Sequence, residues 1–131
     1  MASRSLLLGI IFALSPALSF AEDDKPLGPV EARKEVGKKV TVEMTVKAAK
    51  DRLEKHGEIY LDAEENFKDL KNFAVIITKA GAAKFKEAGI AAPADHFRGK
   101  LIRAKGTVKV VQDVPRIEID DSGDLGIVEK K

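Results

Sequence analysis

Cysteine and tryptophan are absent from this sequence of 131 residues, and one tyrosine and six phenylalanines are its only aromatic residues. Without cysteine there is no disulfide scaffold, thiol nucleophile or cysteine-ligated zinc site, and no lipid anchor on a cysteine. An excess of one charge is also lacking, because 23 basic residues stand against 21 acidic ones. Such a mixed surface differs from the strongly basic footprint of a dedicated DNA-binding protein. The length suits one small domain with a single core.

Residues 1–21 have the pattern of an export signal. A basic residue stands near the start, residues 6–14 form an apolar run, and Ser19 and Ala21 are the small residues that a signal peptidase reads. A serine and a proline interrupt the run before it reaches the roughly 20 apolar residues of a transmembrane helix. We therefore expect a signal peptide at 1–21 and a periplasmic or extracellular mature protein, with no transmembrane segment after cleavage.

The start of the mature chain predicts a leader and a short helix. Residues 22–29 combine charges with prolines and a glycine, so we expect a flexible leader that buries nothing. Residues 30–36 follow a proline and precede a glycine, which is the usual asymmetry of a helix. The domain is expected to span residues 30–128, and residues 129–131 form a charged tail.

Alternation of apolar and polar residues predicts most of the strands. In residues 39–47, every second side chain is apolar, and Ile59 and Leu61 share a face on either side of Tyr60. Residues 72–78 are almost continuously apolar, which indicates a strand covered on both faces but leaves open which residues face inward. The predicted strands are 39–47, 58–62, 72–78, 99–111 and 116–120, with 125–128 closing the sheet.

The segments between these strands complete the expected fold. Residues 50–57 are predicted to be a polar connection. Residues 62–71 are predicted to be a long loop or a single helical turn, with Phe67 and Leu70 as its large apolar anchors. A short helix is expected at 81–89, and Gly106 within a strand suggests a bend or bulge.

The resulting order β-β-β-α-β-β is that of an OB fold. We predict a mainly β protein, a five-stranded OB-fold barrel with a short N-terminal helix. Closing the sheet removes its edges and lets the helix plug one end.

Four segments of the sequence resemble a family of small exported bacterial OB-fold proteins. The resemblance covers about residues 30–128 and is carried by residues 31–37, 72–73, 99–106 and 115–121. Such domains are similar to nucleic-acid-binding OB modules and to the barrel of secreted thermonuclease-type proteins. The turn at residues 122–125 departs from the family pattern. The resemblance implies a fold more than an activity.

The expected ligand surface follows from the way OB folds bind. They present the second and third strands, flanked by two loops, to oligonucleotides or sugars. Here the flanking loops would be residues 50–56 and 112–115. Outward positions of the predicted strands carry aromatic and basic residues, although neighbouring acids such as Glu43, Glu118 and Asp120 could pair with the basic ones. The candidate ligand-binding residues are Tyr60, Phe73, Arg103, Lys105, Lys109 and Arg116.

Residues typical of a metal centre or of catalysis are few. His56 and His96 lie forty residues apart, and neither has a second histidine at ligand spacing. The acids of residues 120–124 could hold calcium, but Asp, Ser and Gly in that order are typical of a turn, which we favour. We expect no metal, no cofactor and no catalytic residue.

Three functions remain open from the sequence. We favour an exported, non-catalytic binding module for single-stranded nucleic acid or another anionic polymer. The alternative is a structural or protein-interaction domain of the cell envelope. A cation-dependent phosphodiesterase is the third, and it would depend on residues such as Asp120 and Arg103.

Overall fold

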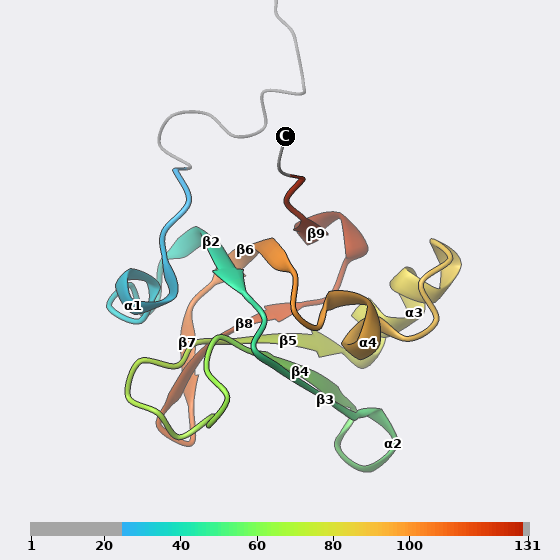
Figure 1. Ribbon diagram of the computed structural model, residues 1–131, viewed down its shortest axis with the longest axis horizontal. Coiled ribbons are helices and arrows are strands. Elements are labelled where there is room, and N and C mark those ends of the chain that lie inside the picture. The colour runs from blue at the N-terminus through green and yellow to red at the C-terminus, as the bar shows by residue number, and fades with distance from the viewer. Residues whose placement is uncertain (1–24, 130–131) are drawn as a thin grey trace, which may run out of the picture.

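A computed structural model describes residues 25–129, so the predicted signal peptide and the last two residues of the tail lie outside the described residues (Figure 1). Within that range, no helix is both long and apolar enough to cross a membrane. The helices are α1 (Pro29–Ala32), α2 (Leu53–His56), α3 (Lys79–Glu87) and α4 (Pro93–Phe97). The strands are β2 (Lys39–Thr45), β3 (Ala48–Arg52), β4 (Glu58–Asp62), β5 (Ala74–Thr78), β6 (Leu101–Thr107), β7 (Lys109–Val111), β8 (Val114–Ile119) and β9 (Leu125–Ile127).

The strands form two sheets, one of three strands in the order β2-β6-β9 and one of five in the order β3-β4-β5-β8-β7. Two stretches of chain belong to both sheets, because β2 continues into β3 and β6 continues into β7. At the first crossing, the Val46 amide donates to the Lys100 carbonyl, and the next amide, of Lys47, donates to the Asp62 carbonyl. The pairing therefore passes from one sheet to the other without a gap.

The strand pairings consequently run in a ring. The continuous stretch β2–β3 pairs with β6 at one end and with β4 at the other, and β5 and β8 form the one parallel pair between named strands. Counting β2–β3 and β6–β7 as one strand each gives the order β-β-β-α-β-β. This is an OB fold, as the sequence predicts.

The interior of the ring is filled by the alternating apolar residues. Val42, Met44 and Val46 are buried on one face of β2 and the residue after it, and Ile59 and Leu61 are buried on β4. Val75 and Ile77 on β5 and Ile117 and Ile119 on β8 complete the lining. Burying each such side chain contributes about 1.5–3 kcal/mol relative to an exposed position. The predicted inward faces of β2, β4 and β8 are confirmed, and the structure settles the inward face of β5, which the sequence leaves open.

The helices α3 and α4 close one end of the barrel (Figure 1). Each contributes a phenylalanine to the core, and the rings of Phe85 and Phe97 meet edge to face with 5.5 Å between centroids. The helix α3 starts two residues earlier than predicted because the Thr78 hydroxyl accepts a hydrogen bond from the Gly81 amide and so caps the helix. The sequence did not predict α4, a single short turn that begins with Pro93.

The structure corrects the expectations for residues 25–37. The helix predicted over 30–36 covers only Pro29–Ala32, and the chain continues in turns to Gly37. Seven residues are too few to hold a helix without packing, and Ala32 is the one residue of α1 that is buried. Within the predicted flexible leader, Leu27 is half-buried and bridges Val42, with its amide donating to the Thr41 carbonyl. This part of the leader is bound to the barrel.

The connections differ from their predictions in two places. Lys50 and Arg52 belong to strand β3 rather than to a polar loop. The loop 62–71 is confirmed, but Phe67 and Leu70 do not anchor it, because they are 44% and 84% exposed. Its anchor is the buried Asn72, which follows the loop.

Gly106 serves close packing rather than a bulge. It pairs with Val40 in regular register, and a Cβ at this position would lie 2.6 Å from Cγ2 of Ile117 on β8. The glycine therefore lets β6 approach β8. The strand is interrupted two residues later at Val108, beyond which the predicted alternation fails, since Val110 is 47% exposed.

Candidate functional site

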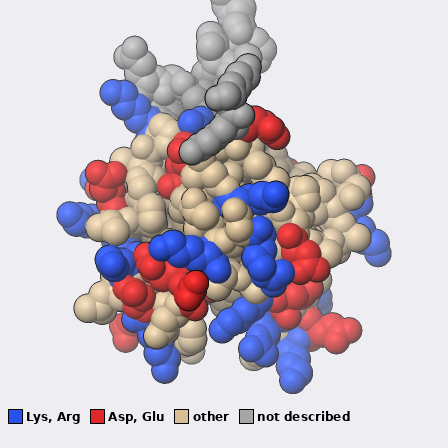
Figure 2. All heavy atoms as spheres, viewed as in Figure 1, with Lys and Arg blue, Asp and Glu red and all other residues tan. Residues whose placement is uncertain are grey.

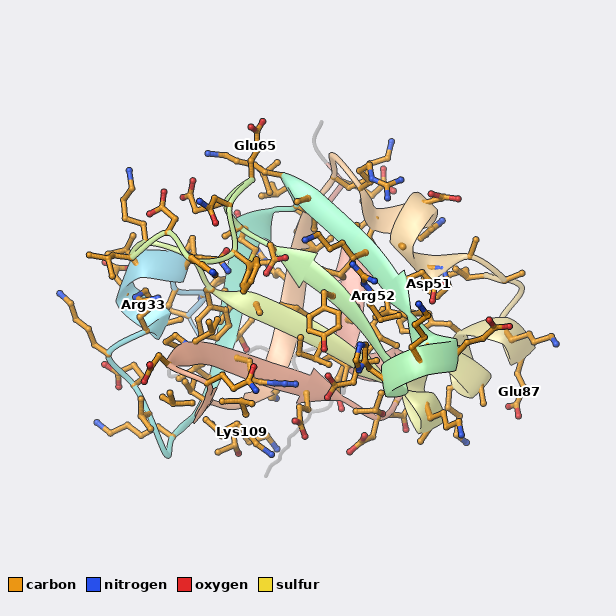
Figure 3. All side chains as sticks on the ribbon, turned by 90° about the horizontal axis from the view of Figure 1, so that it is seen from below. Arg33, Asp51, Arg52, Glu65, Glu87 and Lys109 are labelled. Carbon is orange, nitrogen blue, oxygen red and sulfur yellow. The ribbon has the colours of Figure 1, made fainter. Side chains whose placement is uncertain are left out.

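A groove of about 580 Å³ lies on the outer face of the five-stranded sheet. One end is bordered by α2 and the other by the turn between β7 and β8. Figure 3 looks onto this face and shows Arg52 beside α2 and Lys109 at the opposite edge of the sheet. The groove is lined by Lys50, Arg52, His56, Glu58, Tyr60, Asp62, Phe67, Ala74, Ile76, Val111, Gln112, Val114 and Arg116.

Strand alternation places these side chains on one face. Lys50 on β3, Tyr60 on β4 and Ile76 on β5 are successive cross-strand neighbours, and they point away from the core residues beside them. Ala74, the neighbour of Arg116 across the β5–β8 pair, is small. The groove therefore has an apolar floor on β5, with an aromatic ring and a basic side chain on the adjoining strands.

Three polar side chains form a hydrogen-bonded cluster in the groove. The Tyr60 hydroxyl donates to Oε1 of Glu58 at 2.7 Å, and Nη2 of Arg116 donates to Oε2 of the same carboxylate at 2.8 Å. The Arg116 side chain is only 7% exposed, and its Nε lies 3.5 Å from a Glu118 oxygen without forming a hydrogen bond among the described residues. The cluster links β4 to β8 across β5.

The cluster changes the ionisation of two of its members. Burial would raise the pKa of Glu58, but the hydrogen bonds from Tyr60 and Arg116, with the charges of Arg116 and His56, hold this pKa below its ordinary value. Burial, and then the neighbouring Glu58 carboxylate, raise the pKa of Tyr60. At neutral pH the carboxylate is therefore ionised and the phenol is protonated.

The loop 62–71 brings a second ring to the groove. Phe67 lines it, and the ammonium groups of Lys50 and Lys68 lie 5.2 Å and 5.8 Å from the ring centroid. Such contacts stabilise an exposed cation by about 0.5–1 kcal/mol. Phe67 is thus presented to solvent and flanked by positive charge.

Asn72 holds this loop in place. Its side-chain amide donates to Oδ1 of Asp62 at 3.1 Å and to the carbonyl of Phe67 at 3.2 Å, and its Oδ1 accepts from the Glu64 amide at 3.0 Å. Asn72 is completely buried. Burial of Asp62 raises the pKa of that carboxyl, although the Asn72 hydrogen bond and the charge of Lys50 oppose the shift. A single buried amide therefore determines where Phe67 lies.

The predicted ligand-binding residues do not lie together. Tyr60 and Arg116 are in the groove, but Arg116 is nearly buried rather than exposed on the strand. Phe73 is completely buried in the core, so its expected place on the ligand face is wrong. The reason is its parity in the apolar run, which puts it on the same side as Val75 and Ile77.

The other three predicted residues lie away from the groove. Arg103 and Lys105 are on β6 and line a second hollow, on the three-stranded sheet. Nε of Arg103 donates to Glu43 at 2.8 Å, and Lys109 on β7 pairs with Glu118 at 3.2 Å. At both positions, an outward basic residue thus pairs with an acid on a neighbouring strand. This is one of the two alternatives that the sequence leaves open.

Sequence reasoning missed the basic and aromatic residues that the connections supply. Lys50, Arg52 and His56 fall within the loop predicted to flank the ligand face, but none of them is among the candidate ligand-binding residues. For Phe67, the sequence predicts a role as an apolar anchor of the loop instead. An exposed aromatic residue between acids and lysines was the available signal, since a loop phenylalanine with no apolar neighbours in sequence has little to pack against.

Charge on the molecule is mixed rather than segregated. Figure 2 shows basic and acidic side chains interspersed over the face that it presents. Within the groove, Lys50 and Arg52 are exposed and form no ion pair with another described residue, whereas Arg116 is neutralised by Glu58. The basic character of the groove therefore comes from β3.

The acidic turn near the C-terminus has the predicted geometry. Oδ1 of Asp121 accepts from the Gly123 amide at 3.0 Å and caps a 3₁₀ turn over Ser122–Asp124. Among residues 25–129, no group of three or more His, Asp or Glu side chains is placed to hold a metal ion.

No protein-family model and no curated protein matches this sequence. Several solved structures are similar in fold. Asparaginyl-tRNA synthetase from Pyrococcus horikoshii matches with a TM-score of 0.54 at 15% identity, over 81% of this chain and 23% of that one. Aspartyl tRNA synthetase from Entamoeba histolytica matches with a TM-score of 0.55 at 13% identity, over 86% of this chain and 24% of that one.

A putative aspartyl-tRNA synthetase from Leishmania major gives a TM-score of 0.53 at 10% identity, over 84% of this chain and 22% of that one. The chain spans less than a quarter of the length of each of these three proteins. At these identities the likeness concerns the fold, and it agrees with the OB topology established by the strand pairings.

Proposed function

We propose that this protein binds single-stranded nucleic acid in the groove on the outer face of β3, β4, β5 and β8. The observation that carries the proposal is the groove lining, which combines two aromatic rings with two exposed basic side chains that form no ion pair among the described residues. OB folds bind oligonucleotides on this face, between the two loops that border the groove here. Similarity in fold to aminoacyl-tRNA synthetases is compatible with a nucleic-acid ligand and does not establish one.

The chemistry of the lining suits unpaired bases. Stacking of a base on an aromatic ring is worth about 1–3 kcal/mol and needs no particular base. Tyr60 and Phe67 can supply two such platforms. Arg52 stands at the α2 end and Lys50 beside the Phe67 ring, where phosphates of a bound strand could pass. Duplex DNA, whose bases are already stacked, cannot use the rings.

The small number of basic contacts predicts moderate affinity. If two to three phosphates are neutralised, log K falls with log salt at a slope of about −1.4 to −2.1 for a single strand. A tenfold rise in salt then weakens binding by roughly 25- to 125-fold.

Fluorescence anisotropy with the full chain and a labelled dT strand of about 12 nucleotides tests this proposal at about 20 and 200 mM salt. The double variant Lys50→Ala/Arg52→Ala should bind more weakly and reduce the slope by about 1.4. The matched control is Lys84→Ala/Lys86→Ala, which removes the same charge from the exposed face of α3. It should change neither the affinity nor the slope of its salt dependence. Absence of binding at low salt, or equal losses in both double variants, would refute the proposal.

We further propose that the protein binds without catalysis. Among residues 25–129, no three His, Asp or Glu side chains are placed to hold the metal ion that a cation-dependent phosphodiesterase needs. A labelled strand should therefore remain intact after prolonged incubation with Mg²⁺ or Ca²⁺. Cleavage that is lost in an Asp120→Ala or Arg103→Ala variant would instead favour a phosphodiesterase.

Export completes the proposal and is supported by the sequence of residues 1–21. Expression of the full chain in a bacterium should yield a periplasmic or secreted protein whose mass corresponds to residues 22–131. A protein that stays in the cytoplasm at full mass would contradict this part of the proposal.

A further inference from the structure

The Glu58 carboxylate is unexpected in a groove that binds a polyanion. It lines the groove with 26% of its side chain exposed, and it neutralises Arg116, which could otherwise contact a phosphate. For general attraction of nucleic acid, this negative charge is unfavourable. A feature that weakens the general affinity of a site is a candidate for selectivity.

The carboxylate is also held in one orientation. Tyr60 donates to one oxygen and Arg116 to the other, from two different strands. Arg116 is itself kept in place by burial and by Glu118, 3.5 Å from its Nε. An ionised carboxyl group offers about four acceptor sites, and the two hydrogen bonds use one on each oxygen. Each oxygen can therefore accept one further hydrogen bond from a ligand.

The four bases differ in what they offer to a carboxylate. On its pairing edge guanine has two adjacent donors, N1–H and N2–H, which can reach both oxygens together. Adenine and cytosine place an acceptor nitrogen beside their amino group, and that nitrogen would face the second oxygen. Thymine and uracil have one N–H between two carbonyl groups. Only guanine can make two charge-assisted hydrogen bonds without opposing an acceptor to the carboxylate.

We infer that the groove is selective for a guanine base, with Glu58 accepting hydrogen bonds from guanine N1–H and N2–H. The inference rests on the proposed function and names the base that the same site selects. Tyr60 and Phe67 supply the faces on which the base stacks, and the carboxylate reads its edge. Glu58 is the specificity residue, and Tyr60 and Arg116 position it.

Oligonucleotides that differ in one base test the inference. The full chain is titrated at low salt into labelled dT strands of about nine nucleotides whose central position is dT, dG, dA or dC. A single dG cannot form a guanine quadruplex. The dG strand should bind about 5- to 100-fold more tightly than the other three, as expected for a bidentate contact to a base. GMP should also compete better than AMP, CMP or UMP.

The variant Glu58→Gln identifies the residue responsible. It replaces one acceptor oxygen with a donor, so the preference for dG should fall to near unity. Binding to the all-dT strand should be retained or strengthened because a negative charge is removed, and this retention shows that the variant is folded. The control Glu87→Gln removes an exposed carboxylate from α3, outside the groove lining, and should keep the preference.

The possible outcomes distinguish failure of the proposed function from failure of guanine selectivity. If no strand binds at low salt, the proposed function is refuted. If all four strands bind equally, the proposed function stands and guanine selectivity is overturned. If dG is preferred equally by the wild type and by Glu58→Gln, the role of Glu58 is overturned.

Discussion

Replacing Asn72 by alanine should both destabilise the protein and weaken its binding. The substitution removes the three hydrogen bonds of the side chain and leaves their partners, Asp62, Glu64 and Phe67, with polar atoms unsatisfied. A hydrogen bond contributes a net 0.5–1.5 kcal/mol or so, and an abandoned buried group costs about 1–3 kcal/mol. Because Glu64 and Phe67 are close enough to solvent to recover water, we expect a total loss of about 2–4 kcal/mol.

Urea unfolding measures this loss, and amide hydrogen exchange shows where it acts. The midpoint should fall with an unchanged m-value, and amides of residues 63–71 should exchange faster than those of β4 and β5. Loosening of the loop also removes the fixed position of Phe67. Binding of single-stranded DNA should therefore weaken by nearly as much in Asn72→Ala as in Phe67→Ala.

The control for this prediction is Asn66→Ala in the same loop. Oδ1 of Asn66 accepts from the Lys68 amide at 2.9 Å, but this hydrogen bond is exposed, so its loss should cost about 1 kcal/mol or less. A loss below 1 kcal/mol for Asn72→Ala, or an equal loss in the two variants, would show that the buried amide does not organise the loop.

Three further predictions concern packing, ionisation and the β7–β8 turn. Gly106→Ala should lower the free energy of unfolding, measured in urea, by about 1–3 kcal/mol because its Cβ would lie 2.6 Å from Ile117. The control Gly126→Ala, whose Cβ would have no atom within 4 Å, should be neutral or slightly stabilising. Equal effects of the two substitutions would contradict the close approach of β6 to β8. Because folding lowers the pKa of Glu58, the ionised carboxylate stabilises the protein at pH values above its ordinary pKa of 4.5. This stabilisation is lost as the pH falls through the folded-state pKa. The stability difference between wild type and Glu58→Gln should thus be widest near neutral pH and narrow in acid, and a difference independent of pH would contradict the shift. Gln112 and Asp113 have φ of 51° and 69°, so the double change Gln112→Asn/Asp113→Gly should raise stability by about 1–2 kcal/mol, and no gain would mean that the turn is unstrained.

The fold could be predicted from the sequence where side chains alternate. Residues 40–46, 59–61 and 117–119 have one apolar side chain in every two, and a strand with one buried face is the structure in which that period occurs. β3 was missed because Ala49 is its one buried residue, so no alternation of large apolar residues marks the strand. α4 was missed because five residues are too few to show a helical period.

The site could be predicted only in part, for two physical reasons. In the apolar run 73–77 both faces of the strand are covered, so the composition does not distinguish the inward Phe73 from the groove floor at Ile76. In residues 101–107, alternation gives the face of each residue but not its sheet. Arg103 and Lys105 consequently lie on the three-stranded sheet, because the chain crosses between sheets only at Val108.

The most direct measurement for the central claim is a map of amide chemical shifts during titration of the ¹⁵N-labelled full chain with a single-stranded oligonucleotide. Binding in the groove predicts that the shifting amides cluster at residues 50–60, 67, 74–76 and 111–116, with residues 101–105 and 123–128 unaffected. Shifts concentrated at residues 101–105 and 123–128, or spread evenly over basic residues of the whole surface, would contradict the assignment of the five-stranded face as the ligand surface.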